Sequence, residues 1–237
     1  MPVTGPSHEV RKKVFDFLYH DIDAMPLRQN ASTAFVNILK DGNFQLTLGG
    51  AATGNGSLDL GNIGIQAQDL VSFEALIKLD SIDVNASMCI GMAGTFNADP
   101  DVIAQSAWFK IIGAAGTDAH TIVIETDDGT TNIDDEPTGK TLVIGQWARL
   151  RIDFATGIQS ISAPGLSKGG LGSVQFSMPR TSSGNMFLDK VKATKHMDMS
   201  AITGTQFLQP MVHGVQATTT GTTVLQVKQL CVEYRTK

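Results

Sequence analysis

The stretch over residues 207–237 constrains the fold more than any other part of the chain, because it is dense in strand-forming residues. Apolar residues open a first predicted strand, and β-branched residues fill a second one over residues 224–234. We expect the Thr- and Gly-rich residues 217–223 to join the two strands as a hairpin. In the second strand the apolar spacing changes from two to three between Val227 and Leu230, which predicts a bulge there. Such strands are typical of a β-sandwich.

An alternation of apolar and polar residues, with a period of two, recurs through the middle of the chain. It runs through residues 71–79 and through residues 147–154, as in antiparallel strands with one buried face. The side chains of the second segment are expected to divide into an inward set, Ala148, Leu150, Ile152 and Phe154, and an outward set, Arg149, Arg151 and Asp153. Turns rich in Gly or Asp separate about ten such segments. The chain is therefore predicted to be all-β, with a sandwich or jelly roll over residues 44–237.

Residues 1–43 are predicted to form an N-terminal helix followed by an extended arm. Ser7 can cap a helix, and the apolar residues after it recur at helical spacing until Pro26. They are Val10, Val14, Phe17 and Leu18. Residues 27–43 have a mixed pattern that fits either a strand or an arm. Because the helix would carry an apolar stripe, we expect Phe17 and Leu18 to pack on the chain's own sandwich or on a neighbouring subunit.

Composition narrows the partners of the chain. A net charge of −5 and a pI near 5.4 argue against a nucleic-acid partner, which needs clustered Lys and Arg. No apolar run approaches the roughly 18 residues that a membrane span needs. The N-terminal residues have no apolar signal core either. We therefore expect neither a membrane partner nor an export signal.

An acidic segment over residues 127–136 is the candidate metal site. Its carboxylates could supply the oxygen ligands of a hard cation such as calcium. The proposed ligands are Asp127, Asp128, Asp134 and Asp135. Their spacing does not fit an EF-hand loop, and Asp128-Gly129 is also a strong hairpin-turn signal. A structural turn and a calcium site therefore both stay open, and no other cofactor is expected.

Catalytic patterns are missing from the sequence. The one Gly-x-Ser-x-Gly match, at residues 165–169, lies in a Gly-rich turn with no predicted helix after it, so we expect no nucleophile elbow there. Glu125, Asp127 and Asp128 lack the Glu-x-Asp-x-x-Glu spacing of sandwich-fold glycoside hydrolases. The five histidines are not placed at ligand spacing from Cys, Asp or Glu. We therefore expect no enzymatic activity. Among the aromatic residues, Trp147 follows a turn and could serve as a sugar-stacking platform or pack in the core.

The order of these pieces resembles the virion proteins of tailed phages. A Trp-Phe strand (AWFKIIGA), an Ile-Glu-Thr-Asp-Asp-Gly-Thr turn, a Trp-x-x-x-x-Ile-Asp-Phe strand, a Leu-x-Pro-x-Val strand and a terminal Leu-x-Val strand follow one another. The resemblance covers residues 60–237. This order is similar to the concanavalin-like, or laminin-G-like, jelly rolls that tailed phages use as capsid decoration (cement) proteins and other surface proteins.

The resemblance implies a non-enzymatic virion protein that is made in the host cytoplasm and sits on the capsid surface. Its partners would be the major capsid protein and further copies of itself in a homotrimer, and it would stabilise the head through added interface. The candidate binding residues are Phe17, Leu18, Trp147, Arg149 and Arg151. The alternative is a carbohydrate-binding module on a phage tail or a cell surface. A glycan hydrolase is disfavoured by the carboxylate spacing.

Overall fold

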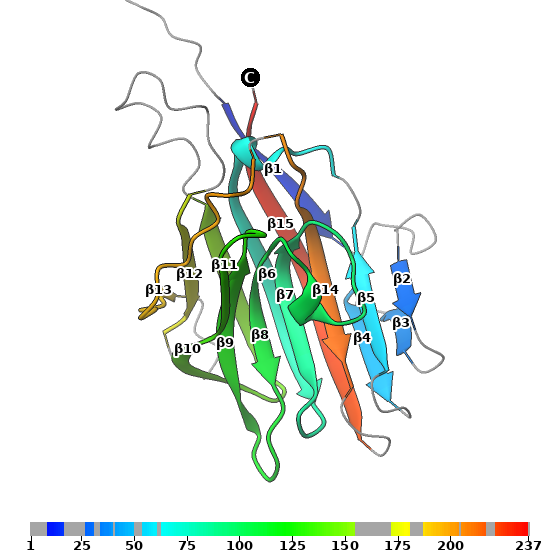
Figure 1. Cartoon of the computed structure of the whole chain (residues 1–237). Helices are drawn as coiled ribbons and strands as arrows, with labels where there is room; N and C mark the ends of the chain where they lie inside the picture. The colour runs from blue at the N-terminus through cyan, green and yellow to red at the C-terminus, as the bar shows by residue number, and fades with distance from the viewer. Residues whose placement is uncertain are drawn as a thin grey trace, which may run out of the picture.

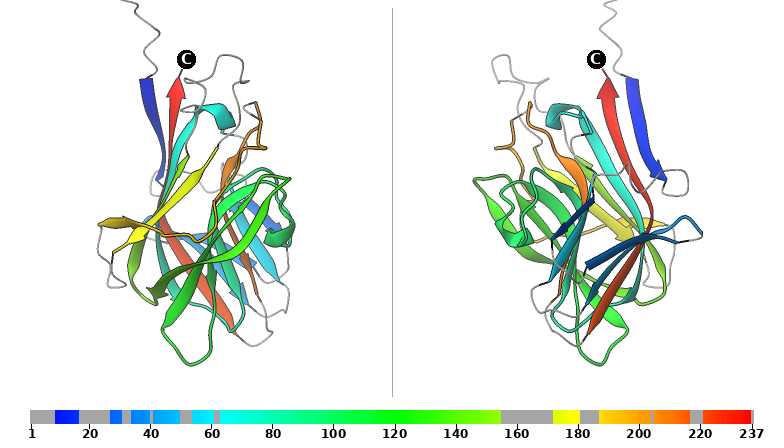
Figure 2. Two further views of the ribbon diagram at one scale, coloured as in Figure 1. Left: turned by 60° about the vertical axis from the view of Figure 1, so that its left-hand side comes forward. Right: turned by 90° about the vertical axis from the view of Figure 1, so that its right-hand side faces the viewer.

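The computed structural model describes residues 9–16, 27–30, 34–39, 41–49, 54–60, 63–154, 172–180, 187–203, 205–216 and 221–236. Its strands form two antiparallel sheets that face each other (Figures 1 and 2). Two short 3-10 helices, η2 (Ala67–Asp69) and η3 (Pro100–Val102), interrupt the connections. Among the described residues no helix is long and apolar enough to cross a membrane.

Sheet A has the strand order β13-β12-β11-β6-β15-β4-β3, and β1 pairs with the C-terminal half of β15. Its strands are β13 (Leu188–Lys190), β12 (Val174–Pro179), β11 (Trp147–Phe154), β6 (Leu70–Ser81), β15 (Thr222–Thr236), β4 (Phe44–Gly49), β3 (Ala34–Ile38) and β1 (Glu9–Asp16).

Sheet B has the strand order β10-β9-β8-β7-β14-β5-β2. Its strands are β10 (Asn132–Val143), β9 (Ala119–Asp127), β8 (Ser106–Ile112), β7 (Ser87–Ala93), β14 (Gln209–Val215), β5 (Asn55–Asp59) and β2 (Leu27–Asn30). The connections between neighbours in sequence repeatedly cross from one sheet to the other, which gives a jelly-roll β-sandwich.

The core lies between the sheets and confirms the predicted alternation. Along β11 the four inward residues are buried, from Ala148 to Phe154, while the residues between them are only half-buried. In β6 the inward positions from Phe73 onward are buried, but Glu74 between them is buried too, and near the start of the strand Leu70 is buried and Val71 is not. The reason is a register shift opposite Glu233, which leaves Val71 outside the ladder.

The C-terminal strands were predicted in the right places, but the hairpin between them is wrong. β14 pairs with β5 and β7 in sheet B, whereas β15 pairs with β4 and β6 in sheet A. Alternation identifies a strand and its buried face, but it does not say which sheet the strand joins. The predicted bulge is confirmed, because the pairing of β15 with β6 shifts register between Val227 and Gln229.

The predicted N-terminal helix is also wrong, because residues 9–16 form strand β1 beside the end of β15 (Figure 2). Backbone pairing with β15 overrides the helical spacing of the apolar residues. On β1 Phe15 is buried, while Val10 and Val14 are exposed. Phe17 and Leu18 lie outside the described residues. The segment predicted as a strand or an arm contributes β2 and β3, which extend the two sheets.

Candidate functional site

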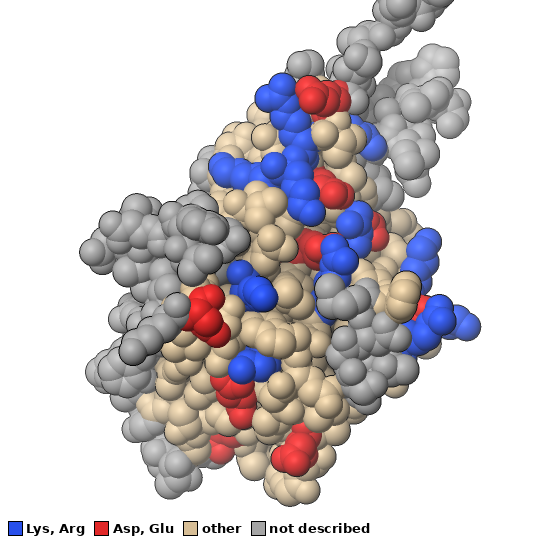
Figure 3. All heavy atoms as spheres, turned by 180° about the vertical axis from the view of Figure 1, so that it is seen from behind, with Lys and Arg blue, Asp and Glu red and all other residues tan. Residues whose placement is uncertain are grey.

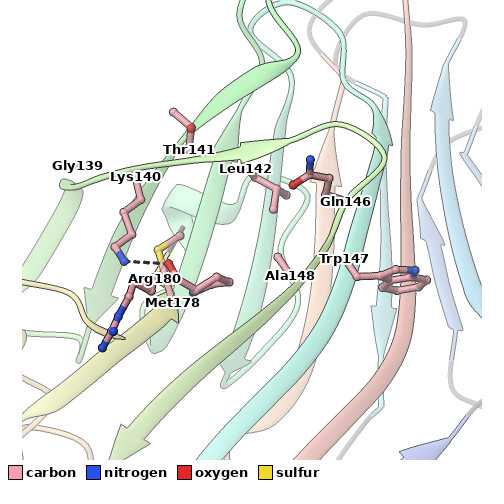
Figure 4. A pocket seen from close by; sticks show the side chains of 10 residues that line it. Gly139, Lys140, Thr141, Leu142, Gln146, Trp147, Ala148, Met178 and Arg180 are labelled. Carbon is pink, nitrogen blue, oxygen red and sulfur yellow. Dashed lines mark hydrogen bonds between the residues drawn. The ribbon is translucent and has the colours of Figure 1, made fainter. Parts of the chain in front are cut away.

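A pocket of about 230 Å³ opens at the edge of the sandwich where β10 of sheet B meets β11 and β12 of sheet A (Figure 4). Leu142, Ala148 and Met178, all buried, form its apolar floor. The other lining residues are Gly139, Lys140, Thr141, Gln146, Trp147, Pro179 and Arg180. The described lining therefore combines an apolar floor with polar walls and contains no carboxylate.

One end of the pocket is cationic. Lys140 on β10 and Arg180 after β12 lie at the same end, away from Gln146 (Figure 4). The Lys140 ammonium donates a hydrogen bond to the Pro179 carbonyl at 2.8 Å, which ties the two sheets together across the pocket. Arg180 Nε lies 3.2 Å from both carboxylate oxygens of Asp189, but this pair is exposed to solvent and therefore weak.

The other end of the pocket presents the amide of Gln146. Its Oε1 atom is buried and has no hydrogen-bond partner within the described part of the chain. The amide points toward Leu142 on the pocket floor (Figure 4). A buried acceptor without a donor costs free energy, and this oxygen is shielded from solvent, so a ligand hydroxyl reaches it only when the Gln146 side chain turns outward.

Trp147 contributes to the pocket, but its ring turns away from Lys140 and Arg180 (Figure 4). The ring lies on the outer face of sheet A, where the Lys78 ammonium is 5.5 Å from its centroid. Phe187, which is 72% exposed, is outside the lining of the pocket but pairs with one of its residues through the backbone. Its carbonyl accepts a hydrogen bond from the Arg180 backbone at 2.9 Å, so Phe187 stands beside the cationic end of the pocket. The sequence pattern did not distinguish this Phe from those in the core.

A second depression, a groove of about 830 Å³, adjoins the opposite end of β12. Its floor is apolar and includes Phe154, Val174 and Met197. Polar and basic side chains form its rim: Asp153, Ser173, Gln175, Lys190, Lys192, Lys195 and His196. Ser173 Oγ lies 2.6 Å from His196 Nε2, and this pair is exposed on the rim.

Arg149 and Arg151 face outward, as predicted, but solvent is not their only neighbour. Arg149 Nη2 lies 2.6 Å from Glu74 Oε1, and Arg151 Nη2 lies 3.3 Å from Glu233 Oε2. Arg151 Nε also contacts Asp153 at 2.8 Å. These ion pairs join β6, β11 and β15 on the outer face of sheet A, where basic and acidic side chains alternate (Figure 3). The two arginines therefore stabilise the sheet and do not line the pocket.

The four aspartates proposed for calcium are not gathered into one site. Asp127 accepts the Gly129 amide, Asp134 accepts the Asn132 side chain, and Asp135 pairs with Lys110. Buried Asp128 accepts the backbone amides of Thr130, Thr131 and Ala201. In the part of the chain that the structure describes, no group of three or more His, Cys, Asp or Glu residues is placed to hold a metal ion.

A buried charge cluster on the outer face of sheet B was not predicted. Lys110 Nζ lies 2.8 Å from Glu125 Oε1, 2.9 Å from Asp101 and 3.3 Å from Asp135. Trp108 Nε1 donates to the other Glu125 oxygen at 2.9 Å. Burial raises the pKa of Glu125 to about 7, although Lys110 and Trp108 act in the opposite direction. The only sequence signal was the outward position of Lys110 and Glu125 in two alternating strands.

Residues 94–105 lie over this outer face (Figure 1). Asp101 from this loop reaches Lys110, and the Ala98 carbonyl lies 3.2 Å from His213 Nε2. The ring of Phe96 meets the His213 ring edge-on at 5.4 Å. The charge cluster is therefore covered, whereas the pocket at β10, β11 and β12 is open.

No model of a known protein family matches this sequence, and no curated protein matches it. Solved structures do match. Peanut lectin in complex with a nine-residue peptide aligns with a TM-score of 0.59 and 10% identity, over 96% of this chain and 99% of the lectin. A protein of unknown function from Shewanella oneidensis MR-1 aligns with a TM-score of 0.57 and 10% identity, over 95% of this chain and 87% of that protein. Arcelin-5, a lectin-like defence protein from Phaseolus vulgaris, aligns with a TM-score of 0.51 and 11% identity, over 95% of this chain and 99% of arcelin-5. These likenesses establish the fold as a lectin-type, concanavalin-like jelly roll.

Proposed function

We propose that this protein is a carbohydrate-binding domain that takes one sugar unit in the pocket between β10, β11 and β12. The observation that carries the proposal is the pocket itself, which is open, has an apolar floor and has hydrogen-bonding groups at both ends. At about 230 Å³ it is smaller than the roughly 300–1,000 Å³ sites of drug-sized ligands, so it suits a single sugar unit.

The chemistry of the lining matches the two-sided character of a sugar ring. The C–H face of the ring can lie on Leu142, Ala148 and Met178, while its hydroxyls meet the polar walls. The Gln146 amide, turned outward, can accept one hydroxyl, and Lys140 or Arg180 can donate to another sugar oxygen. Phe187 offers an exposed ring on which a neighbouring sugar unit can stack.

The same lining supports binding without hydrolysis. Most glycoside hydrolases place two carboxyl groups on either side of the bond they cleave. The described lining of the pocket has none, and Glu125, whose pKa is raised, is buried in the covered cluster on sheet B. The pocket therefore has the groups to hold a sugar but lacks this pair of catalytic groups.

A glycan array followed by calorimetric titration of the best ligand tests the proposal. We expect Gln146→Ala and Phe187→Ala each to weaken binding about tenfold, a loss of roughly 1.4 kcal/mol. Their matched controls are Gln45→Ala on β4 and Phe207→Ala, which lie outside the pocket and should leave the affinity unchanged. Binding to no glycan would contradict the proposal. Mass spectrometry of the bound oligosaccharide after prolonged incubation should show intact chains, and shorter products would contradict a non-catalytic role.

A role in assembly, including the capsid decoration function that the resemblance implies, is a second candidate. One observation favours it: the apolar residues Val10 and Val14 are exposed on β1, next to the end of β15. Exposed apolar residues on a strand at the side of a sheet are typical of contact surfaces. If copies of the chain associate there, light scattering should show a homotrimer for the wild-type protein. The double variant Val10→Asp, Val14→Asp should be a monomer. A monomer in both cases would contradict self-assembly through β1.

A further inference from the structure

We propose that the sugar in the pocket belongs to an acidic polysaccharide, whose chain continues past Arg180 and over the partly exposed strand β13 to the groove at the other end of β12. This inference rests on the proposed function and names its ligand class. The ligand would carry carboxylate or sulfate groups, and the basic side chains along β12 and β13 would pair with them.

Positive charge is concentrated at this edge of an otherwise acidic protein. Residues 172–197 contain Arg180, Lys190, Lys192 and Lys195, with Asp189 as their only acidic residue, in a chain of net charge −5. The three lysines are exposed and line the groove. Basic side chains are visible at the edge of the molecule where β12 and β13 lie (Figure 3). A cationic edge of this kind selects a ligand with regularly spaced negative charges.

The segment that carries these lysines is held in place by the rest of the fold. Glu136 on β10 accepts hydrogen bonds from the Thr194 hydroxyl at 2.7 Å and from the Lys195 amide at 3.3 Å, and also from the Thr194 amide. The Thr194 hydroxyl bond is the main reason that the pKa of Glu136 lies below its ordinary value. The Val191 amide donates to the Phe176 carbonyl of β12 at 2.8 Å. Because the backbone is fixed at these points, binding would order little more than the lysine side chains.

The geometry of β12 gives the length of the ligand. The pocket adjoins Met178, Pro179 and Arg180 at one end of the strand, and the groove adjoins Ser173 and Val174 at the other. At about 3.4 Å per residue the strand separates the two by roughly 17 Å. A single sugar cannot reach both depressions, whereas a short oligosaccharide can.

The charge spacing favours a glycan over a nucleic acid. With Asp189 and Asp153 counted, the four cationic side chains leave a net charge of about +2 over this length, or one positive charge per roughly 8–9 Å, whereas a DNA duplex carries one negative charge per about 1.7 Å. A polysaccharide with an acidic group on each unit, or on alternate units, has the lower density that this edge can match.

Two ligands with one backbone test the inference: polygalacturonate and its fully methyl-esterified form, in which each carboxylate is neutralised. We expect the full-length protein to bind polygalacturonate at least tenfold more tightly than the methyl ester in affinity electrophoresis and calorimetry. Dextran sulfate is the sulfated probe, and binding to it at least tenfold tighter than to the methyl ester would identify a sulfated ligand. Lys192→Glu with Lys195→Glu should remove that preference. The matched control is Arg11→Glu with Lys228→Glu, which makes the same charge change at exposed sites on β1 and β15 and should retain it. Lys228 is four strands from β13 in sheet A, or about 19 Å.

The outcomes separate this inference from the proposed function. Binding of a neutral glycan that depends on Gln146, without a preference for acidic chains, would overturn the inference and leave the proposed function standing. Binding of no glycan would overturn both. Equal affinity for single-stranded DNA and for the acidic polysaccharides, or an equal loss in both double variants, would also overturn the inference, because it would show attraction to any polyanion.

Discussion

Lys110 Nζ lies 2.8 Å from Glu125 Oε1, and the two side chains are only 9% and 4% exposed. Trp108 and Glu125 are directly opposite in the register of β8 and β9, so Lys110 is the diagonal neighbour of Glu125 on the same face. Asp101 from the covering loop and Asp135 from β10 also pair with Lys110, so three carboxylates share one ammonium. Asp135 has a positive φ of 48°, within the irregular part of β10. The cluster therefore fastens the covering loop and the edge strand to sheet B.

Removal of Lys110 should destabilise the protein strongly. Lys110→Ala leaves Glu125 buried beside Asp135 without its cation, and breaking a buried pair in this way costs about 3–5 kcal/mol. Urea unfolding at pH 8, where the carboxylate is ionised, measures the change. The exposed Lys228→Ala on β15 serves as control and should cost less than about 0.5 kcal/mol. A small loss at Lys110 would show that the cluster is not structural.

The raised pKa of Glu125 predicts the direction of one pH effect. Burial raises this pKa from 4.5 to about 7, so between these values the folded state binds the proton more tightly than the unfolded state does. The contribution of Glu125 to stability is thus fully present below pH 4.5 and is lost as the pH rises through about 7. Relative to Glu125→Gln, the wild-type protein should lose stability between pH 5 and pH 8. A gain over that interval would mean that Lys110 holds the pKa of Glu125 low.

Two substitutions on β11 should differ in size for a structural reason. Phe154→Ala removes a buried ring from the core and should cost about 3–5 kcal/mol. Arg149→Ala leaves Glu74, which is buried, with only the longer 3.6 Å contact to Arg151, and should cost roughly 1–2 kcal/mol because Arg149 itself is partly exposed. Chemical denaturation of both variants checks the order. If Phe154→Ala were harmless, the inward assignment of β11 would be wrong.

The sequence predicted strands well where a single face is buried. Alternation identified both faces of β11, and a break in alternation located the bulge in β15. It failed for β1, because Val10, Val14, Phe17 and Leu18 fit a helical stripe equally well and only pairing with the distant β15 decides the matter.

The candidate site was predicted less well, for a related reason. The pocket joins β10 of sheet B to β11 and β12 of sheet A, so its lining is assembled by contacts between sheets. The backbone bond to Arg180 places Phe187 beside it. Trp147 was found by its residue type, but it is the first residue of β11 and shares the outward face with Arg149 and Arg151, so its ring lies on the outer face of sheet A. The alternation in β11 already indicates the direction of Trp147, whereas the sheet to which a strand belongs does not follow from local spacing.

Asp128 should act as a structural acceptor. Burial alone would raise its pKa, but the backbone amides of Thr131, Ala201 and Thr130 outweigh burial and lower the pKa below its ordinary value. Asp128→Ala leaves these amides without their acceptor and should cost about 1–3 kcal/mol. The contribution of the carboxylate is present above its unfolded pKa and lost as the pH falls through the lowered folded value. Thermal melts at pH 7 and below pH 4 measure both effects. A rise in melting temperature on adding calcium that Asp128→Ala abolishes would instead support the calcium site.

The most direct test of the proposed function is a map of backbone amide chemical shifts by NMR during titration with the glycan that an array identifies. The expected shifts cluster at Lys140, Thr141, Gln146 and Arg180, with Phe187 among them, and Gln146→Ala should make them several-fold smaller at the same subsaturating ligand concentration. Shifts confined to Arg149 and Arg151 on the outer face of sheet A, or to residues 94–105 over sheet B, would contradict binding in the pocket between β10, β11 and β12.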